Sequence, residues 1–251
     1  MIDTHIHICD GKYDNDRKEM LERARLAGVN KFLNIGAEIE ETRKVAVFRE
    51  DGVWAALGLH PHYIDVLNGE IFAELRGFFL TDAKIAAVGE IGLDYFKSTV
   101  EKNVQKEGFK KLISLASEFD KPVVIHSRDA HDDVLEILAE NRVKKAGIIH
   151  CFSADYETAK KFMDLGFVFG IGGVITFPNS GALRDAIKKI PLENIVLETD
   201  APWLAPQKFR GQRNEASYIP LIAEKLAEIK GVNVQDVINT TTAAACRVLG
   251  I

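Results

Sequence analysis

The sequence predicts an α/β fold with a single domain, a (β/α)8 or TIM barrel. Eight short apolar runs with β propensity alternate with stretches of helical periodicity almost without a break. Strands separated by helices pair in parallel through right-handed crossovers. The length of 251 residues suits one closed barrel, and no linker, repeat or low-complexity tract divides residues 1–251. An open doubly wound sheet is the alternative, but the count of eight and the near-continuous apolar strands favour closure.

The first half of the chain supplies four strands and four helices. The strands are expected at residues 2–7, 31–37, 53–59 and 85–90, where apolar and β-branched residues run together. The intervening helices are expected at 17–27, 39–50, 70–79 and 101–119. The last of these is amphipathic, because apolar side chains recur at helical spacing at Val104, Phe109, Leu112, Ile113, Ala116 and Phe119.

The second half repeats this alternation and ends in helices. Strands are expected at residues 122–126, 146–150, 167–171 and 194–199. Helices are expected between them at 130–140, 155–165 and 181–190. Two more helices, at 214–230 and 234–248, follow the eighth strand and complete the chain.

The first strand carries two histidines at alternate positions. Side chains alternate between the faces of a strand, so His5 and His7 project to one side. The opposite face is expected to form an apolar strip against helices, made of Ile2, Thr4, Ile6 and Ile8. Two imidazoles at the end of a buried strand can bind a divalent metal or can be core histidines bonded to the backbone. This pattern alone leaves both interpretations open.

Residues able to bind metal gather at the carboxyl ends of the expected strands. That end of a barrel is where enzymes of this architecture form their active sites. Six of the seven histidines are in this set, and only His131 lies on an expected helix. The full set is His5, His7, His60, His62, Glu90, His126, His150 and Asp200. Chance scatter does not favour this distribution, and it is the strongest physical argument in the sequence.

Strand parity supports a shared site. In four strands, the metal-competent residue at the mouth of the barrel should project to the same side as the residue two positions before it, because side chains alternate along a strand. The four pairs are Val88 with Glu90, Val124 with His126, Ile148 with His150, and Glu198 with Asp200. A mixed histidine and carboxylate shell suits zinc, manganese or iron and leaves magnesium possible. Four histidines and two acids are enough for two divalent ions bridged by a carboxylate such as Glu90. Two such ions would activate a water as the nucleophile of a displacement.

Net charge and cysteine content limit which functions and cellular locations the protein can have. The net charge of −5 argues against a protein that coats nucleic acid nonspecifically. One basic patch, Lys208, Arg210 and Arg213, is either a solvated loop or a small site for nucleotides. The three cysteines form no C-x-x-C pair, and no apolar run is long enough to span a bilayer. The first strand begins at the second residue, which leaves no room for a targeting peptide, so we expect a cytoplasmic protein.

Several stretches match one family from end to end and in the family's order. They are IDTHIH at 2–7, GLHPH at 58–62, VGEIGLDYF at 88–96, KPVVIHSRDA at 121–130, HCFS at 150–153, LETDAPWLAP at 197–206 and RGQRNEASY at 210–218, with Gln105 and Phe109 between them. On these motifs the chain resembles the TatD family of metal-dependent deoxyribonucleases, within the wider amidohydrolase-like barrel hydrolases. The departures are Ala216 in place of a usual proline and Ala243-Ala244-Ala245 where an asparagine is common. Neither departure falls on an expected ligand.

The resemblance implies a dinuclear metal site and a nuclease activity. One metal would take His5, His7, Glu90 and Asp200, and the second would take Glu90, His126 and His150. The ions would be zinc, manganese or magnesium. The implied reaction is hydrolysis of DNA phosphodiester bonds, as a 3′→5′ exonuclease, with RNA a further possible substrate. The catalytic residues would be Glu90, Asp200 and His62.

Other residues at the mouth have two interpretations each. His62 either contacts the scissile phosphate and assists proton transfer or is a loop histidine after Pro61, and we favour function. His60 is less certain and can be structural. Arg128 either binds phosphate or pairs with Asp94 or Asp129, while Arg210 is expected to contact substrate. Glu198 is expected to hydrogen-bond a ligand, and Trp203 either stacks on a base or packs its loop.

Two other functions use the same residues. The first is a metal-dependent ester or amide hydrolase, for example a deacylase of aminoacyl-nucleic acid, because fold alone does not decide substrate. Glu90 stands on strand four where other amidohydrolase-like barrels have a carboxylated lysine, so the family resemblance favours the phosphodiesterase. The second is a metal-stabilised scaffold that binds a partner, although a structural zinc site would be closed and buried. We expect a monomer in either case.

Overall fold

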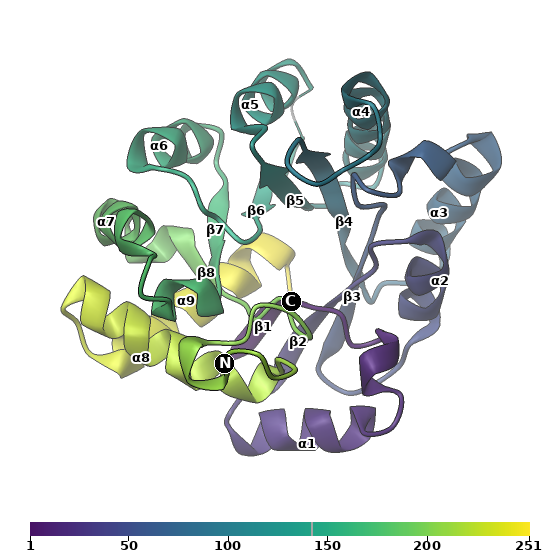
Figure 1. Ribbon diagram of the computed structural model, residues 1–251. Helices are drawn as coiled ribbons and strands as arrows, with labels where there is room; N and C mark the ends of the chain where they lie inside the picture. The colour runs from purple at the N-terminus through teal and green to yellow at the C-terminus, as the bar shows by residue number, and fades with distance from the viewer. Residues whose placement is uncertain (142) are drawn as a thin grey trace.

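Parallel strands surrounded by helices make up the fold (Figure 1), and TIM-barrel topology requires eight of them, which the sheet has. The computed structural model describes residues 1–141 and 143–251. The strands form one sheet in the order β1-β2-β3-β4-β5-β6-β7-β8. A parallel bridge between Ile6 and Ala201 joins β1 to the segment that follows β8. The sheet therefore curls into a nearly closed ring, and the barrel predicted from the sequence is confirmed.

The strands are short, as expected for a barrel of this size. They are β1 Ile2–Ile6, β2 Lys31–Ile35, β3 Val53–Leu57, β4 Ile85–Asp94, β5 Val123–Arg128, β6 Gly147–Ile149, β7 Val168–Ile171 and β8 Ile195–Leu197. All eight predicted strands are present. The fourth runs four residues beyond its predicted end, so Glu90 lies within β4 rather than at its end.

The helices also follow the prediction closely. The α-helices are α1 Arg17–Leu26, α2 Ile39–Val47, α3 Gly69–Thr81, α4 Lys102–Glu118, α5 His131–Glu140, α6 Tyr156–Asp164, α7 Gly181–Lys189, α8 Ile219–Lys230 and α9 Val234–Leu249. The 3-10 turns are η1 Gly11–Tyr13, η2 Ile64–Val66, η3 Gly173–Thr176, η4 Leu192–Asn194, η5 Gln207–Phe209 and η6 Ala216–Tyr218. Among the described residues, no helix is both long enough and apolar enough to cross a bilayer.

The start of α8 differs from the prediction. The helix begins at Ile219 and not at residue 214. The side-chain amide of Asn214 donates to the carbonyls of Thr199, at 2.8 Å, and Trp203, at 2.5 Å. These bonds hold residue 214 against the segment after β8. Helix α8 therefore begins only after the residues that make this contact.

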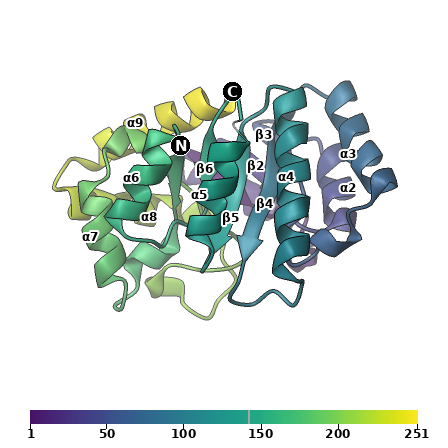
Figure 2. The same cartoon turned by 90° about the horizontal axis from the view of Figure 1, so that it is seen from above.

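Helix α9 closes the amino-terminal end of the barrel. In Figure 2 this helix and both termini lie at one end, and the arrowhead of β4 points toward the other. Ala244, Ala245 and Leu249 pack into the inner apolar cluster, beside residues such as Val124 and Ile148. The alanines are fully buried, so their small side chains let the helix sit close under the strands. The opposite end of the barrel remains available for a site.

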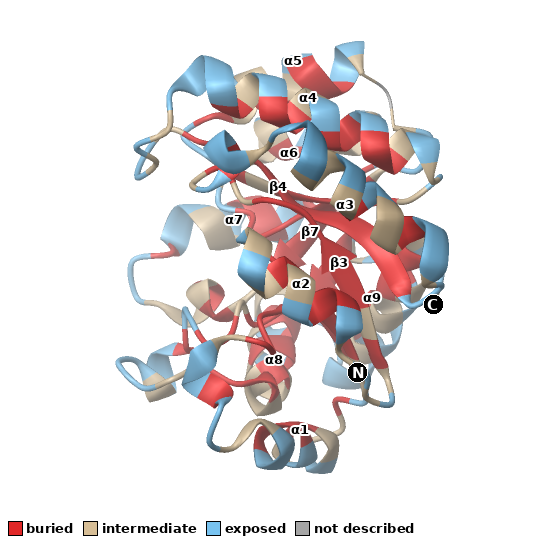
Figure 3. Ribbon diagram, turned by 90° about the vertical axis from the view of Figure 1, so that its right-hand side faces the viewer, coloured by how far each residue is buried: buried red, intermediate tan, exposed pale blue. Residues whose placement is uncertain are grey.

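Two layers of apolar packing fix which residues face inward. One cluster fills the barrel, and a second lies between the strands and the helices that surround them, so the strands are buried on both faces (Figure 3). Two of the predictions about which residues of a strand share a face are wrong. Ile2 lies in the inner cluster, not with Ile6 and Ile8, because the β1–β2 register shifts between Asp3 and Ile6.

The same correction applies to Val88 on β4. Val88 packs in the outer cluster, whereas Glu90 lines the pocket at the mouth, because the β4–β5 register shifts between Val88 and Ile91. The parity predicted for β5 and β6 is confirmed. Val124 and Ile148 lie in the inner cluster, and the histidines two positions later line that pocket.

Candidate metal centre

The line where the barrel closes brings the two ends of the sequence together. We call residues 3–7 and 197–201 the closing seam. The Asp200 amide donates to the His5 carbonyl at 2.9 Å, and the His7 amide donates to the Ala201 carbonyl at 2.8 Å. The buried Asp3 carboxylate accepts from the amide and the hydroxyl of Thr199, at 3.0 and 2.6 Å. These bonds fix the positions from which His5, His7 and Asp200 project.

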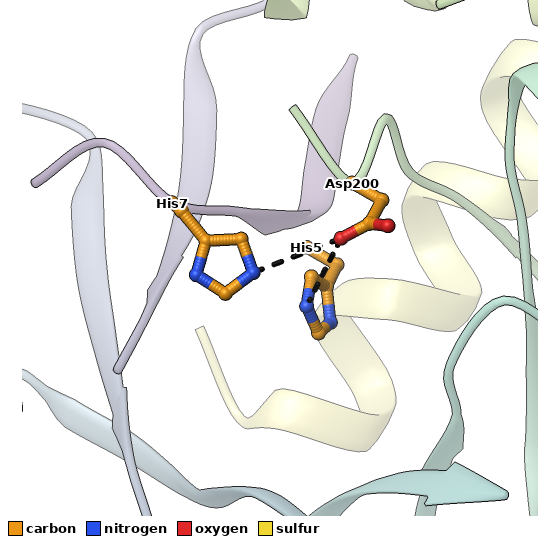
Figure 4. A group of neighbouring side chains, drawn as sticks. All are labelled: His5, His7 and Asp200. Atoms are coloured by element: carbon orange, nitrogen blue, oxygen red, sulfur yellow. Dashed lines mark ion pairs between the residues drawn. The ribbon is translucent and has the colours of Figure 1, made fainter. Parts of the chain in front are cut away.

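His5, His7 and Asp200 form the first group with ligand geometry. Figure 4 shows both rings directed at the carboxylate, with each Nε2 atom 3.7 Å from Asp200 Oδ1. One ligand atom from each residue lies within 4.8 Å of the others. Both ring nitrogens of His5 are buried and have no hydrogen-bond partner. A buried imidazole without partners is costly in free energy, so this donor set fits a divalent cation.

Glu90 lies among four imidazoles. Its Oε1 is 2.8 Å from His126 Nδ1, 3.6 Å from His150 Nε2 and 3.7 Å from His60 Nε2, and its Oε2 is 3.4 Å from His5 Nε2. Burial favours the neutral acid, but the surrounding histidines hold the Glu90 pKa well below its ordinary value. The side chain is therefore a carboxylate, which is the form that can bridge two cations.

Three of the histidines use one ring nitrogen to approach Asp200 or Glu90, and a further carboxylate contacts the other ring nitrogen of each. Glu41 lies 3.3 Å from His7 Nδ1, Asp94 lies 3.0 Å from His126 Nε2, and Glu198 lies 3.0 Å from His150 Nδ1. Such contacts set the tautomer and orientation of a ligating histidine. Glu198 was expected to have this position. Glu41 and Asp94 were missed as histidine partners.

The electrostatics of His150 follow from these carboxylates. Burial alone would lower its pKa, but Glu198 and Glu90 outweigh burial and raise the pKa of His150 to about 9. The ring therefore lies in a strongly negative environment. A divalent cation would relieve this excess of negative charge.

The histidines after β3 also belong to the centre. His60 places Nε2 near Glu90, and its Nδ1 accepts from the His62 amide at 3.1 Å. Burial lowers the pKa of His60 to about 3, so the ring is neutral and able to act as a ligand. His62 Nε2 lies 3.2 Å from Asp94 Oδ2. His60 precedes Pro61 in the loop after β3, and the sequence placed it among the metal-competent residues but left a structural role open.

The residues surround a pocket of about 340 Å³ at the carboxyl ends of the strands. His62, Tyr63 and Trp203 line it together with the proposed metal ligands His7, Glu90, His126, His150 and Asp200. Arg128 and Arg210 do not line it. Arg128 lies over the Phe96 ring at 4.3 Å, and none of the ion pairs among the described residues joins it to Asp94 or Asp129. The contact of Arg128 with substrate remains a prediction.

Comparisons with known proteins agree on one family. The family model described as TatD related DNase matches residues 2–250. A metal-dependent hydrolase of Bacillus subtilis, YabD, is 37% identical over 100% of this chain and 99% of its own. The 3′-5′ ssDNA/RNA exonuclease TatD of Cronobacter sakazakii is 35% identical over 98% of this chain and 97% of its own. The crystal structure of the TatD homologue YjjV of Escherichia coli matches with a TM-score of 0.96 and 31% identity, covering 100% of this chain and 98% of the other.

Proposed function

The chain belongs to the TatD-related DNase family of metal-dependent hydrolases, and we propose that it hydrolyses phosphodiester bonds of DNA as a 3′→5′ exonuclease. The observation that carries the proposal is the position of Glu90, one buried carboxylate within 3.7 Å of four histidine rings. The polarity is taken from the Cronobacter relative, whose name also includes RNA as a substrate. Family membership favours this function over the ester or amide hydrolase and over a scaffold without activity.

We assign two divalent ions to this centre. His5, His7, Glu90 and Asp200 would hold one, and Glu90, His126 and His150 would hold the other. The group His5–His7–Asp200, the group His60–Glu90–His126 and the unpartnered nitrogens of His5 support metal binding here. His150 is included because its Nε2 lies 3.6 Å from Glu90 Oε1. A nitrogen-rich shell favours zinc or manganese over magnesium. When bound, such ions polarise the phosphoryl oxygens and make a water nucleophilic near neutral pH.

The protein's own groups would orient the substrate and move protons. Asp200 lies at the mouth with its carboxylate toward two histidines and is placed to accept a proton from the attacking water. His62 lines the same pocket and is half-buried, so it can reach both the substrate phosphate and bulk solvent. We assign it to phosphate contact and to protonation of the leaving oxygen. Arg128 and Arg210 are exposed cations available to phosphates farther along a strand.

Every residue of this proposed site comes from one chain. The strands and the loops after them supply all six proposed ligands from this one chain. A monomer is therefore sufficient for the proposed activity.

Cleavage of end-labelled single-stranded DNA tests the function. The protein would be treated with EDTA and then supplied with zinc, manganese or magnesium. We expect a metal-dependent ladder that shortens from the 3′ end. Glu90→Gln and Asp200→Asn should lower the rate at least ~100-fold, because each removes a charged ligand from the centre.

Circular dichroism of both variants controls for loss of fold. Full activity in either folded variant would refute the ligand assignment. If the folded, metal-loaded wild type does not cleave DNA, an ester or amide substrate at the same centre becomes the better hypothesis.

A further inference from the structure

A second pocket adjoins the metal centre. It has a volume of about 490 Å³ and is lined by Lys12, Phe177, Trp203, Arg210 and Arg213 among others. Trp203 lines both pockets, so the two share one wall. Its residues come from the turn after β1, the turn after β7 and the loop between β8 and α8. These segments follow the carboxyl ends of their strands, on the side of the barrel where the metal centre lies.

The second pocket carries the opposite charge from the first. Acidic groups dominate the wall of the metal centre, which contains Asp10, Glu38, Glu41, Glu90 and Asp200. No acidic residue lines the second pocket, which has Lys12, Arg210 and Arg213 instead. Arg213 is paired with Asp16 at 2.6 Å. Among the described residues, neither Lys12 nor Arg210 takes part in an ion pair, so both can bind an anion without breaking one.

The two free cations lie on aromatic faces. Lys12 Nζ is 3.0 Å from the centre of the Trp203 ring, and the Arg210 guanidinium is 4.2 Å from that of Phe177. Trp203 is 48% exposed, which is unusual for a tryptophan in a well-packed loop. Lys12 covers part of the Trp203 ring, yet Trp203 stays 48% exposed, so ring surface remains for a base to stack on while the cations bind phosphates.

The pocket wall is held in place before any ligand binds. Asn214 donates to the Trp203 carbonyl, and Arg213 donates to the carboxylate of Asp16, which directly precedes α1. The Trp203 amide also donates to the carbonyl of Asp200 at 2.8 Å. This last bond ties the position of the indole directly to a proposed metal ligand. A base on Trp203 would thus lie at a fixed distance from the reacting phosphate.

We propose that the second pocket binds the nucleotide next to the scissile phosphate of a single-stranded nucleic acid. The base stacks on Trp203, and the phosphate on the far side of that nucleotide binds Lys12 and Arg210. The proposal rests on the proposed nuclease function, since it assigns the neighbouring pocket to the same substrate. It explains how an acidic metal centre on a protein of net charge −5 can retain a polyanion.

Equilibrium binding tests the pocket without requiring cleavage. Metal-loaded protein would be titrated into a fluorescein-labelled oligothymidylate with nuclease-resistant phosphorothioate linkages, and anisotropy would give Kd. We expect Trp203→Ala, Lys12→Ala and Arg210→Ala each to weaken binding about tenfold, and Trp203→Phe to retain most of it. A double-stranded competitor of equal length should bind more weakly, since its bases are already stacked.

Lys208→Ala is the matched control. Lys208 lies two residues before Arg210 on the same loop and has the same charge, but it does not line the pocket. Its substitution should change Kd by less than about twofold, the effect of one distant surface charge. Equal losses in Lys208→Ala and Arg210→Ala would overturn the proposal in favour of nonspecific attraction, as would unchanged binding by Trp203→Ala.

A small diester separates this proposal from the nuclease assignment. Bis(4-nitrophenyl) phosphate has a single phosphate, and its hydrolysis reports on the metal centre alone. We expect Arg210→Ala to lower kcat/KM for the oligonucleotide more than for the small diester, by about tenfold in the ratio. If neither substrate is cleaved but the oligonucleotide binding still depends on Trp203, the nuclease assignment fails and the pocket stands. If both are cleaved and the ratio is unchanged, the pocket proposal fails and the nuclease stands.

Discussion

Individual carboxylates decide which nitrogen each histidine offers to the centre. Glu41 contacts Nδ1 of His7 and leaves Nε2 directed at Asp200. The same carboxylate accepts from the Ala37 amide at 3.0 Å, which fixes its own position at the start of α2. Glu41 is thus a positioning residue, since it acts on the proposed metal through His7.

Removal of Glu41 should therefore weaken metal binding. We expect Glu41→Ala to lower zinc affinity about 10–100-fold, the usual effect of losing a carboxylate behind a ligating histidine, and Glu41→Gln to have an intermediate effect. Competition with a chromophoric zinc chelator measures it. Glu40→Gln on the same helix is the control, because Glu40 is exposed and pairs with Arg43. Comparable losses in both variants would show that general charge, not the contact with His7, is responsible.

At the scale of elements, β7 and β8 approach closely beside the centre. A Cβ atom added to Gly170 on β7 would lie 2.0 Å from Glu198 Oε2, well inside van der Waals contact. Glu198 is fully buried and contacts His150, so it has little room to move away. Only glycine at this position of β7 leaves room for the carboxylate of Glu198, the residue after β8, to reach the centre.

Two glycine substitutions should therefore have opposite effects. Gly170→Ala should destabilise the protein by about 1–3 kcal/mol through overpacking, and should also weaken zinc binding. Gly77→Ala should stabilise it by about 0.5–1 kcal/mol, because Gly77 lies within α3 with open space around the added methyl group. Urea unfolding measures both. A neutral Gly170→Ala variant would mean that Glu198 can move without loss.

Local pattern predicted the elements well and their irregularities poorly. The alternation of apolar runs and helical stretches predicted all eight strands. The clustering of histidines after strands predicted which side chains the structure brings together at the mouth of the barrel. Strict alternation failed at Ile2 and Val88, because each precedes a register shift that depends on the neighbouring strand. Glu41 and Asp94 were missed as histidine partners because their contacts join different elements. Nothing within 39–50 marks one helical acid as the partner of His7.

At the scale of the molecule, the core does not depend on the centre. The inner and outer clusters are apolar and continuous, and α9 closes the barrel at the end opposite the metal pocket. The centre instead gathers titratable side chains, and both ring nitrogens of the buried His5 lack a hydrogen-bond partner there. Metal should therefore add stability to a fold that already exists.

Metal removal should lower the melting temperature without unfolding the protein at 25 °C. An ion at 100 times its Kd adds about 2.7 kcal/mol, so Tm should rise with zinc concentration. Differential scanning calorimetry in EDTA and in graded zinc measures this. Asp200→Asn should show a smaller rise, since it lacks one charged ligand. Unfolding by EDTA at 25 °C would support the scaffold hypothesis, in which metal is structural.

The closing seam also sets the order in which the centre can appear in a newly made chain. His5 and His7 leave the ribosome first, but their partners across the seam begin at residue 197. Until about four-fifths of the protein has been translated, the first strand has a free edge and its histidines lack Asp200. The proposed hydrolytic activity therefore cannot appear before residues 197–201 have been translated. A truncated product that ends before residue 197 would lack Asp200 and should not cleave the nucleic acid of the cell that makes it.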